Sequence, residues 1–155
     1  MNDQLKPMGS RILSRVLETP SAAPAVAKSH FRARLEVETD PSDVYVDLRN
    51  GENGFLLVDV RSKEAFSESH IPGAINMPYR EINASRVAHL SKDKLIVVYC
   101  FSPACNAATK AALRLAELGF FVKEMIGGIE YWQREGYPVA TSDQPEVELS
   151  APVLG

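Results

Sequence analysis

The sequence predicts an α/β domain built on a small parallel sheet. Three apolar runs of strand length, residues 55–60, 95–99 and 121–125, alternate with stretches of helical periodicity. The runs at 55–60 and 95–99 are almost continuously apolar, which is typical of strands that helices cover on both faces. Such alternation favours parallel strands, and a parallel sheet binds ligands beyond the carboxyl ends of its strands.

The first half of the chain can be assigned from cap residues and breakers. A weak helical pattern runs from Ala25 to Leu35, after a linker at residues 21–24. Asp40-Pro41 places an oxygen-bearing cap before a proline, so a helix begins there and ends near Asn50-Gly51. We then expect a strand over 55–60, a short helix over 62–69 and a short strand over 74–77.

The second half is assigned in the same way. The apolar strand 95–99 is followed by a loop and then by an alanine-rich helix over 107–118, which ends at Gly119. A strand over 121–125 comes next. The pair Gly127-Gly128 predicts a turn, and a helix follows over 129–135, which Gly136 ends.

The length and composition favour one domain. The chain has 155 residues, of which 45% are hydrophobic and 24% charged, as in ordinary globular proteins. We expect the domain to span residues 25–140. Residues 1–24 are predicted to form a flexible or partly helical N-terminal arm. Residues 141–155 show no periodicity and are predicted to form a disordered C-terminal tail.

Charge and hydropathy exclude several function classes. A net charge of −3 gives no sign of the excess of basic residues that nucleic-acid-binding proteins use. No apolar run approaches the roughly 20 residues of a membrane-spanning helix, and the N-terminal residues lack the apolar core of a secretory signal. Two cysteines five positions apart do not staple a domain, so we expect a reducing, cytoplasmic compartment. His30 and His89 lack partners at metal-ligand spacing, and we expect neither a metal nor a cofactor.

Cys100 is the leading candidate for chemistry. It follows the central strand directly and precedes the amino terminus of the helix at 107–118. The unpaired N–H groups and partial positive charge of a helix amino terminus favour a thiolate over a thiol. The alternative is a structural cysteine, because free cysteines are among the most buried residues. Asp59 also ends a predicted strand, and this convergence at one edge of the sheet favours the functional interpretation.

Three motifs, in order, resemble those of rhodanese-like domains. The first contains Asp59-Val60-Arg61 and the run from His70 to Pro78. The second is Val97-Val98-Tyr99-Cys100, and the third is the stretch from Gly127 to Trp132 with Gly136-Tyr137-Pro138 after it. The resemblance covers residues 42–139. It implies a three-layer domain in which helices flank a sheet of about five parallel strands.

The resemblance also implies a function, which is sulfur transfer through a persulfide. Cys100 would take sulfane sulfur from a small anionic donor such as thiosulfate and pass it to a thiophilic acceptor such as cyanide or a protein thiol. Asp59, Arg61 and Lys110 would have supporting roles, with Asp59 and Arg61 bracing one another or the nearby backbone. The loop would cradle the anion with its amides; it consists of Phe101, Ser102, Pro103, Ala104, Cys105 and Asn106.

The loop departs from the family pattern in its charge. It contains no basic residue before Lys110, and Cys105 stands where the family commonly has an arginine. The missing guanidinium disfavours a phosphatase of the related dual-specificity class, because that fork clamps the oxyanion. Two alternatives to the sulfurtransferase stay open. One is a thiol redox enzyme or sensor in which Cys105 resolves a modified Cys100, and the other is a non-catalytic rhodanese-like binding module.

Overall fold

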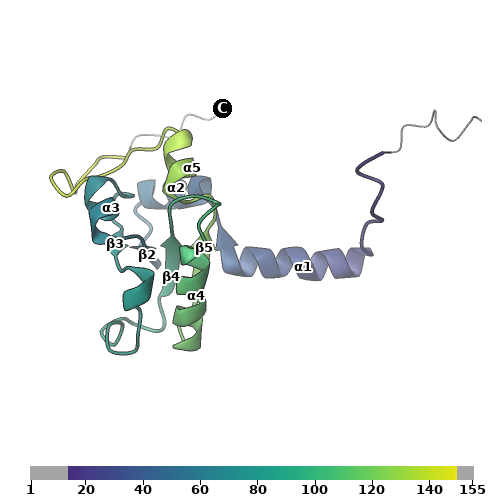
Figure 1. The fold of residues 1–155 in the computed structure, drawn as a ribbon, viewed down its shortest axis with the longest axis horizontal. Coiled ribbons are helices and arrows are strands. Elements are labelled where there is room, and N and C mark those ends of the chain that lie inside the picture. Colours follow the sequence, from purple (N-terminus) through teal and green to yellow (C-terminus); the bar gives the residue numbers. More distant parts are fainter. Residues whose placement is uncertain (1–13, 150–155) are drawn as a thin grey trace, which may run out of the picture. The chain divides into compact units, whose positions relative to one another are not determined.

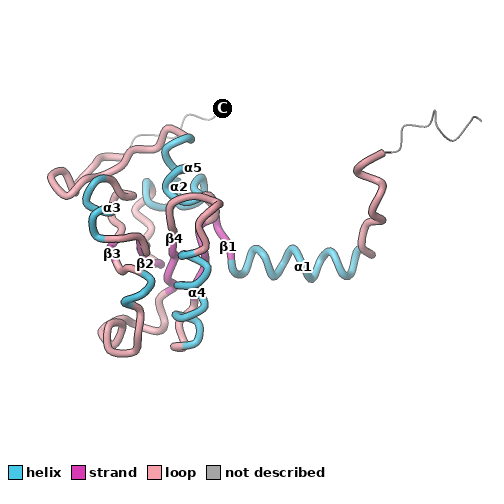
Figure 2. The backbone as a smooth tube through the Cα atoms, in the orientation of Figure 1, coloured by secondary structure: helices cyan, strands magenta, loops and turns pink. Residues whose placement is uncertain are grey.

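The computed structural model describes residues 14–149 (Figures 1 and 2). The elements in chain order are α1 (Pro24–Val37), β1 (Glu38–Thr39), α2 (Pro41–Arg49), β2 (Phe55–Asp59), α3 (Lys63–Glu68), β3 (Ile75–Asn76), the 3-10 helix η2 (Tyr79–Glu81), β4 (Leu95–Tyr99), α4 (Ala107–Glu117), β5 (Val122–Met125) and α5 (Gly128–Arg134). The chain divides into two compact units, residues 1–33 and 34–155. The sheet and the core described below belong to the second unit.

The sheet has five strands in the order β1-β5-β4-β2-β3, and every neighbouring pair is parallel. Its central pair is fully in register, with Val58 beside Val98 and Asp59 beside Tyr99. β4 lies in the middle, so its carboxyl end opens at the centre of one sheet edge. This arrangement confirms the predicted fold class.

Two hydrophobic clusters lie on the two faces of the sheet, because successive side chains of a strand point to opposite faces. Val58 and Val98 belong to the cluster that packs against α4 through Ala111 and Leu115. Their neighbours Leu57, Val97 and Tyr99 belong to the other cluster. That cluster contains Tyr45 of α2 and the fully buried Trp132 of α5. The domain therefore has three layers, with α4 on one face and α2 and α5 on the other.

The predicted helix boundaries follow from local chemistry that the structure shows directly. The Asp43 N–H donates to Asp40 Oδ1 at 2.8 Å, and Pro41 is the first helical residue of α2. α4 ends where Gly119 adopts a φ of +90°, as the glycine rule predicts. The predicted strands at 55–60, 74–77, 95–99 and 121–125 are all present with small shifts in their ends. These element predictions are confirmed.

Two elements were not predicted, β1 and η2. Each has two or three residues, which is too few for a periodic pattern. β1 matters for function because it adds Glu38 to the edge of the sheet next to β5. The helix expected over 25–35 forms as the longer α1, with no buried residue.

The two ends of the chain bear on the proposed domain boundaries. Most of the predicted N-terminal arm lies outside the described residues; residues 15–17 form a turn, and a bend follows at 18–19. Residues 141–149 contain no helix or strand. The Ser142 N–H nevertheless donates to the Ser67 carbonyl at 3.1 Å, and Leu149 packs against the cluster that contains Trp132. The boundaries at 24/25 and 140/141 stay predictions. Between residues 14 and 149, no helix is long and apolar enough to cross a membrane.

Candidate functional site

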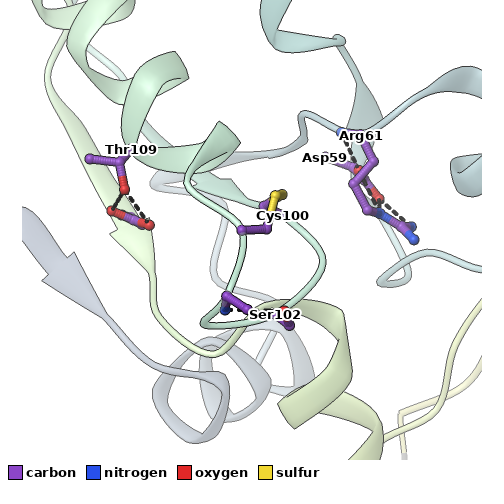
Figure 3. The surroundings of a disulfide bond; sticks show 8 residues. Asp59, Arg61, Cys100, Ser102 and Thr109 are labelled. Atoms are coloured by element: carbon purple, nitrogen blue, oxygen red, sulfur yellow. Dashed lines mark hydrogen bonds and ion pairs between the residues drawn. A yellow bond between two sulfur atoms is a disulfide. The ribbon is translucent and has the colours of Figure 1, made fainter.

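Cys100 lies at the carboxyl end of β4 and is bonded to Cys105 in a disulfide (Figure 3). Cys100 is only 4% exposed, and its Cα lies 6.5 Å from that of Cys105. Cys105 is half-buried and packs against the α4 side of the core. The structure thus brings together the two thiols that the sequence analysis singled out.

The loop between the cysteines is a tight turn that Ser102 organises. The Ser102 carbonyl accepts the Cys105 N–H at 3.0 Å, and Ser102 Oγ accepts the Ala104 N–H at 3.2 Å. Pro103 has no N–H to donate. In this disulfide form, two of the amides predicted to cradle an anion are therefore bonded within the loop. The cradle itself stays a prediction.

The amino terminus of α5 holds the loop through two backbone hydrogen bonds. The Ile129 N–H donates to the Cys100 carbonyl at 3.1 Å, and the Glu130 N–H donates to the Phe101 carbonyl at 2.9 Å. Gly128 makes this approach possible. Its φ is +65°, and a Cβ there would lie 2.6 Å from the Phe101 carbonyl carbon and 2.7 Å from the Cys100 oxygen. The pair Gly127-Gly128 predicts a turn and begins the third family motif, but no signal in the sequence predicts its contact with the loop.

A cavity of about 300 Å³ opens beside the disulfide. Both cysteines, Asn106 and the first turn of α4 line it on one side, and the residues after β5 line it on the other. Asn106 precedes α4 without a side-chain capping bond, so the helix amino terminus presents backbone N–H groups near the cavity. A thiolate on Cys100 would be stabilised by this partial positive charge.

The opposite wall of the cavity is acidic, which the sequence analysis did not foresee. Glu38 of β1 and Glu124 of β5 line the cavity and are register partners on adjacent strands. Thr109 Oγ1 of α4 donates to both carboxylate oxygens of Glu124, at 3.0 and 2.9 Å (Figure 3). Burial raises the pKa of Glu124, the Thr109 bond opposes this, and the charge of Glu38 adds to the rise. No sequence signal marked the pair because β1 was not predicted.

Asp59 and Arg61 form a buried, bidentate ion pair near the loop (Figure 3). Arg61 Nε lies 3.0 Å from Asp59 Oδ1, and the second guanidinium nitrogen lies 2.7 Å from Oδ2 and 2.5 Å from the Ser69 carbonyl. The Arg61 guanidinium also lies 5.5 Å from the centre of the Phe101 ring. The pair thus braces the end of β2 and contacts the loop. These contacts support the structural role that the sequence analysis favoured.

Tyr99, the last residue of β4, is buried next to this ion pair. Its hydroxyl accepts the Ile71 N–H at 3.0 Å. Burial raises the pKa of Tyr99 well above its ordinary value, and the charge of Asp59 raises it further. Tyr99 is therefore a neutral, structural phenol at physiological pH.

Lys110 is the third predicted supporting residue. Its side chain is exposed, with Nζ 5.8 Å from the centre of the Tyr79 ring. It does not line the 300 Å³ cavity. Its predicted role in the cradle stays untested.

A second, more apolar cavity of about 440 Å³ adjoins the first. The two share Pro103, Ile126 and Gly127 in their linings. The second cavity is also lined by Pro41 and Tyr131, with Asp40 and Glu135 as its charged residues. Over residues 14–149, no group of three or more His, Cys, Asp or Glu side chains is arranged to hold a metal ion.

Comparison with solved structures supports the fold assignment. The BH2092 protein of Bacillus halodurans is 46% identical, with a TM-score of 0.76 over 83% of this chain and 94% of that chain. The rhodanese-like domain of the Anabaena protein Alr3790 is 27% identical, with a TM-score of 0.62 over 77% of this chain and 92% of that one.

Named relatives fall into more than one class. Thiosulfate sulfurtransferase GlpE of Pseudomonas syringae is 37% identical over 58% of this chain and 82% of that protein. The HTH-type transcriptional regulator Rv0324 of Mycobacterium tuberculosis is 42% identical over 59% of this chain, but this chain spans only 41% of the regulator. The rhodanese-like domain family itself matches residues 41–135. This match, with the five-stranded parallel sheet and the loop that ends in Cys100 and Cys105, shows that the chain belongs to the rhodanese-like domain family.

Proposed function

We propose that this chain is a sulfurtransferase that carries sulfane sulfur as a persulfide on Cys100. The observation that carries the proposal is the position of Cys100 at the carboxyl end of the central strand. It lines a cavity into which the amino terminus of α4 also opens. The sulfurtransferase names of relatives at 33–37% identity support the same reaction class.

The proposed reaction begins with reduction of the Cys100–Cys105 disulfide. A thiol reductant attacks Cys105 Sγ, the S–S bond breaks, and Cys100 leaves as a thiolate. A second reductant thiol then cleaves the mixed disulfide on Cys105, which frees Cys105 and leaves the two reductant thiols joined as a disulfide. This thiolate attacks the outer sulfur of the donor, whose own S–S bond breaks, and the leaving group departs with the electron pair. An acceptor nucleophile then attacks the outer sulfur of the Cys100 persulfide. Cys100 is released as a thiolate, and the N–H groups of the loop residues other than Pro103 stabilise the negative charge.

A mass measurement tests the proposal. The reduced protein, incubated with thiosulfate, should gain the mass of one sulfur atom, and cyanide should remove it. Cys100→Ser should gain none, because a serine hydroxyl is neither ionised nor soft enough to hold the sulfur, while Cys105→Ser should still gain it. If peptide mass spectrometry located the added sulfur on Cys105, with Cys100→Ser still active, the assignment would be wrong.

The disulfide favours a second candidate function, thiol redox chemistry. Cys105 lies close enough to attack Cys100 Sγ in the persulfide. That step would form the disulfide, break the bond to the outer sulfur and release hydrosulfide, HS⁻. If this occurs, the reduced wild type should release one sulfide for each disulfide formed, while Cys105→Ser should retain a longer-lived persulfide. Release of no sulfide by the wild type would exclude this function.

The binding-module alternative predicts an ordinary thiol. A titration of alkylation rate against pH should place the pKa of Cys100 well below the reference of about 8.5 if the site is catalytic. A thiol that reacts at the reference pKa would support the binding module. We also propose a cytoplasmic location, because a reducing compartment keeps the Cys100–Cys105 disulfide open before the first transfer.

A further inference from the structure

Among residues 14–149, the two adjoining cavities of the site are lined by carboxylates and by no basic side chain. Glu38 and Glu124 line the cavity at Cys100, and Asp40 and Glu135 line the apolar cavity beside it. Within the described part of the chain, no lysine, arginine or histidine lines either cavity. This is unexpected at a site whose predicted donor, thiosulfate, is a dianion.

The stability of the fold does not explain the carboxylate pair. Like charges directly opposite one another on adjacent strands are destabilising. Glu38 has one cationic neighbour, the exposed Arg34 at 3.2 Å, while Glu124 is bonded only to the neutral Thr109 hydroxyl. Burial and repulsion both raise the pKa of Glu124. Because this like-charge pair lines the same cavity as Cys100, it points to a role in substrate selection.

The adjoining cavity offers room for side chains of a larger substrate. At about 440 Å³, it exceeds the cavity at the sulfurs. Ile126 and Tyr131 are 42% and 39% exposed there. Because Pro103, Ile126 and Gly127 line both cavities, a ligand in the larger one lies next to the cavity that Cys100 lines.

We infer that the sulfur donor of this site is a persulfide on a cysteine of a protein segment that carries basic and apolar side chains, rather than a small dianion. The inference rests on the proposed function of Cys100. An apolar side chain of the segment would occupy the larger cavity, and a cationic one would lie near Glu38 and Glu124. Electrostatic complementarity of this kind selects partners and raises association rates more than it raises affinity.

The chemical step is balanced without another reactant. The Cys100 thiolate attacks the outer sulfur of the segment's hydrodisulfide. A bond forms between Cys100 Sγ and that sulfur, and the original S–S bond of the donor breaks. The segment leaves as a thiolate with the electron pair, and the proton on the outer sulfur stays there. A thiosulfate dianion would undergo the same step, but it would approach two carboxylates.

Three donors test the inference on the full-length reduced protein. They are thiosulfate and two synthetic peptide persulfides that share an isoleucine beside the cysteine but carry either lysines or glutamates around it. The basic peptide should transfer sulfur to Cys100 at least about tenfold faster than the acidic one at low ionic strength. This preference should shrink as salt is added, because screening weakens interactions between exposed charges.

Variants of this protein test the contribution of the carboxylates and that of the apolar cavity separately. Glu38→Gln with Glu124→Gln should reduce the preference for the basic peptide about tenfold and accelerate transfer from thiosulfate by a similar factor. Glu117→Gln, exposed at the end of α4, is the matched control and should change neither rate. Ile126→Ala should raise the KM of both peptides several-fold more than it raises the KM of thiosulfate, because the peptides alone would fill the larger cavity. Leu113→Ala, 60% exposed on α4, is its control.

Different outcomes would contradict the proposed sulfurtransferase function and the inferred donor. If no donor, thiosulfate included, transfers sulfur to Cys100, the proposed sulfurtransferase function fails. If all three donors react and the two peptides do so equally, or the double variant keeps the wild-type preference, then only the inference about the donor is wrong.

Discussion

Asp59 and Arg61 are buried together at the end of β2, at 0% and 8% exposure. Removal of one partner leaves the other as an unpaired buried charge. Asp59→Ala should therefore lower the free energy of unfolding by about 3–5 kcal/mol. Chemical denaturation measures this loss, and sulfur transfer should fall no more than the folded fraction does.

An exposed ion pair provides the control for Asp59→Ala. Glu130 pairs with Arg134 at 3.4 Å, and the two side chains are 38% and 66% exposed. Glu130→Ala should therefore change stability by only about 0.5 kcal/mol. If Asp59→Ala were as stable as Glu130→Ala but inactive, Asp59 would have to be assigned to catalysis.

Glu124 should give the stability of the protein a measurable pH dependence. Its pKa is raised above the ordinary 4.5, first by burial and further by Glu38, while the Thr109 bond partly offsets the rise. The folded state therefore holds the proton more tightly than the unfolded state. Stability falls as pH rises from about 4.5 through the raised pKa, and the loss persists at neutral pH.

Glu124→Gln removes this titration and keeps an acceptor for Thr109. At pH 7 the variant should be more stable by up to about 1 kcal/mol, the range for a cross-strand like-charge pair at a partly exposed site. The gain should disappear below about pH 4.5, where the wild-type carboxyl is protonated in both states. Thermal unfolding of both proteins across this range measures the effect. Equal stability at pH 7 would show that Arg34 and solvent neutralise the repulsion.

At the scale of elements, the contact between the loop and α5 depends on Gly128. Gly128→Ala would add a methyl group 2.6–2.7 Å from the Phe101 and Cys100 carbonyls and force an L side chain to a φ of +65°. We expect a stability loss of about 2 kcal/mol or more. Displacement of the loop should also slow alkylation of reduced Cys100 at least about tenfold.

Gly136 offers a matched control for this substitution. Its φ is +80°, but a Cβ there would have no atom within 4 Å. Gly136→Ala should therefore show only the backbone penalty of about 1–2 kcal/mol, with normal Cys100 reactivity. If both variants reacted normally, the α5 contact would not position the loop.

The elements that were predicted are those whose sequence carries a local signal. The cap at Asp40-Pro41 fixed α2, and the continuous apolar runs fixed β2 and β4. The placement of Cys100 followed from these. β1 had no such signal, because a two-residue strand is defined by its bonds to a distant partner rather than by periodicity. The Glu38–Glu124 pair depends on that long-range pairing and was missed with it.

At the scale of the whole molecule, the site joins segments that lie far apart in the sequence. Its cavity is lined from β1, the loop after β4, the first turn of α4, and β5 with the turn after it. The sequence predicted the sheet edge where these meet, since the strands are parallel. The charge of the cavity could not be predicted, because it depends on which side chains of four segments face one another.

The two ends of the chain differ in how much they contribute to the stability of the domain. Every buried apolar residue among those described lies between Pro41 and Ala140. Deletion of residues 1–22 should therefore leave the thermal unfolding temperature and the Cys100 alkylation rate unchanged. Deletion of residues 142–155 removes the Ser142 bond to Ser67 and the packing of Leu149, so it should lower stability by about 1 kcal/mol and leave Cys100 reactive.

Leu149→Ser in the full-length chain tests whether packing causes that loss, and it should reproduce most of the effect of the C-terminal deletion. Leu17→Ser is its counterpart near the other end, at a side chain that is 79% exposed, and it should have no effect. A collapse of folded protein on deletion of residues 1–22 would show that the N-terminal segment is part of the domain. In that case the boundary at residue 24 would have to move toward the amino terminus.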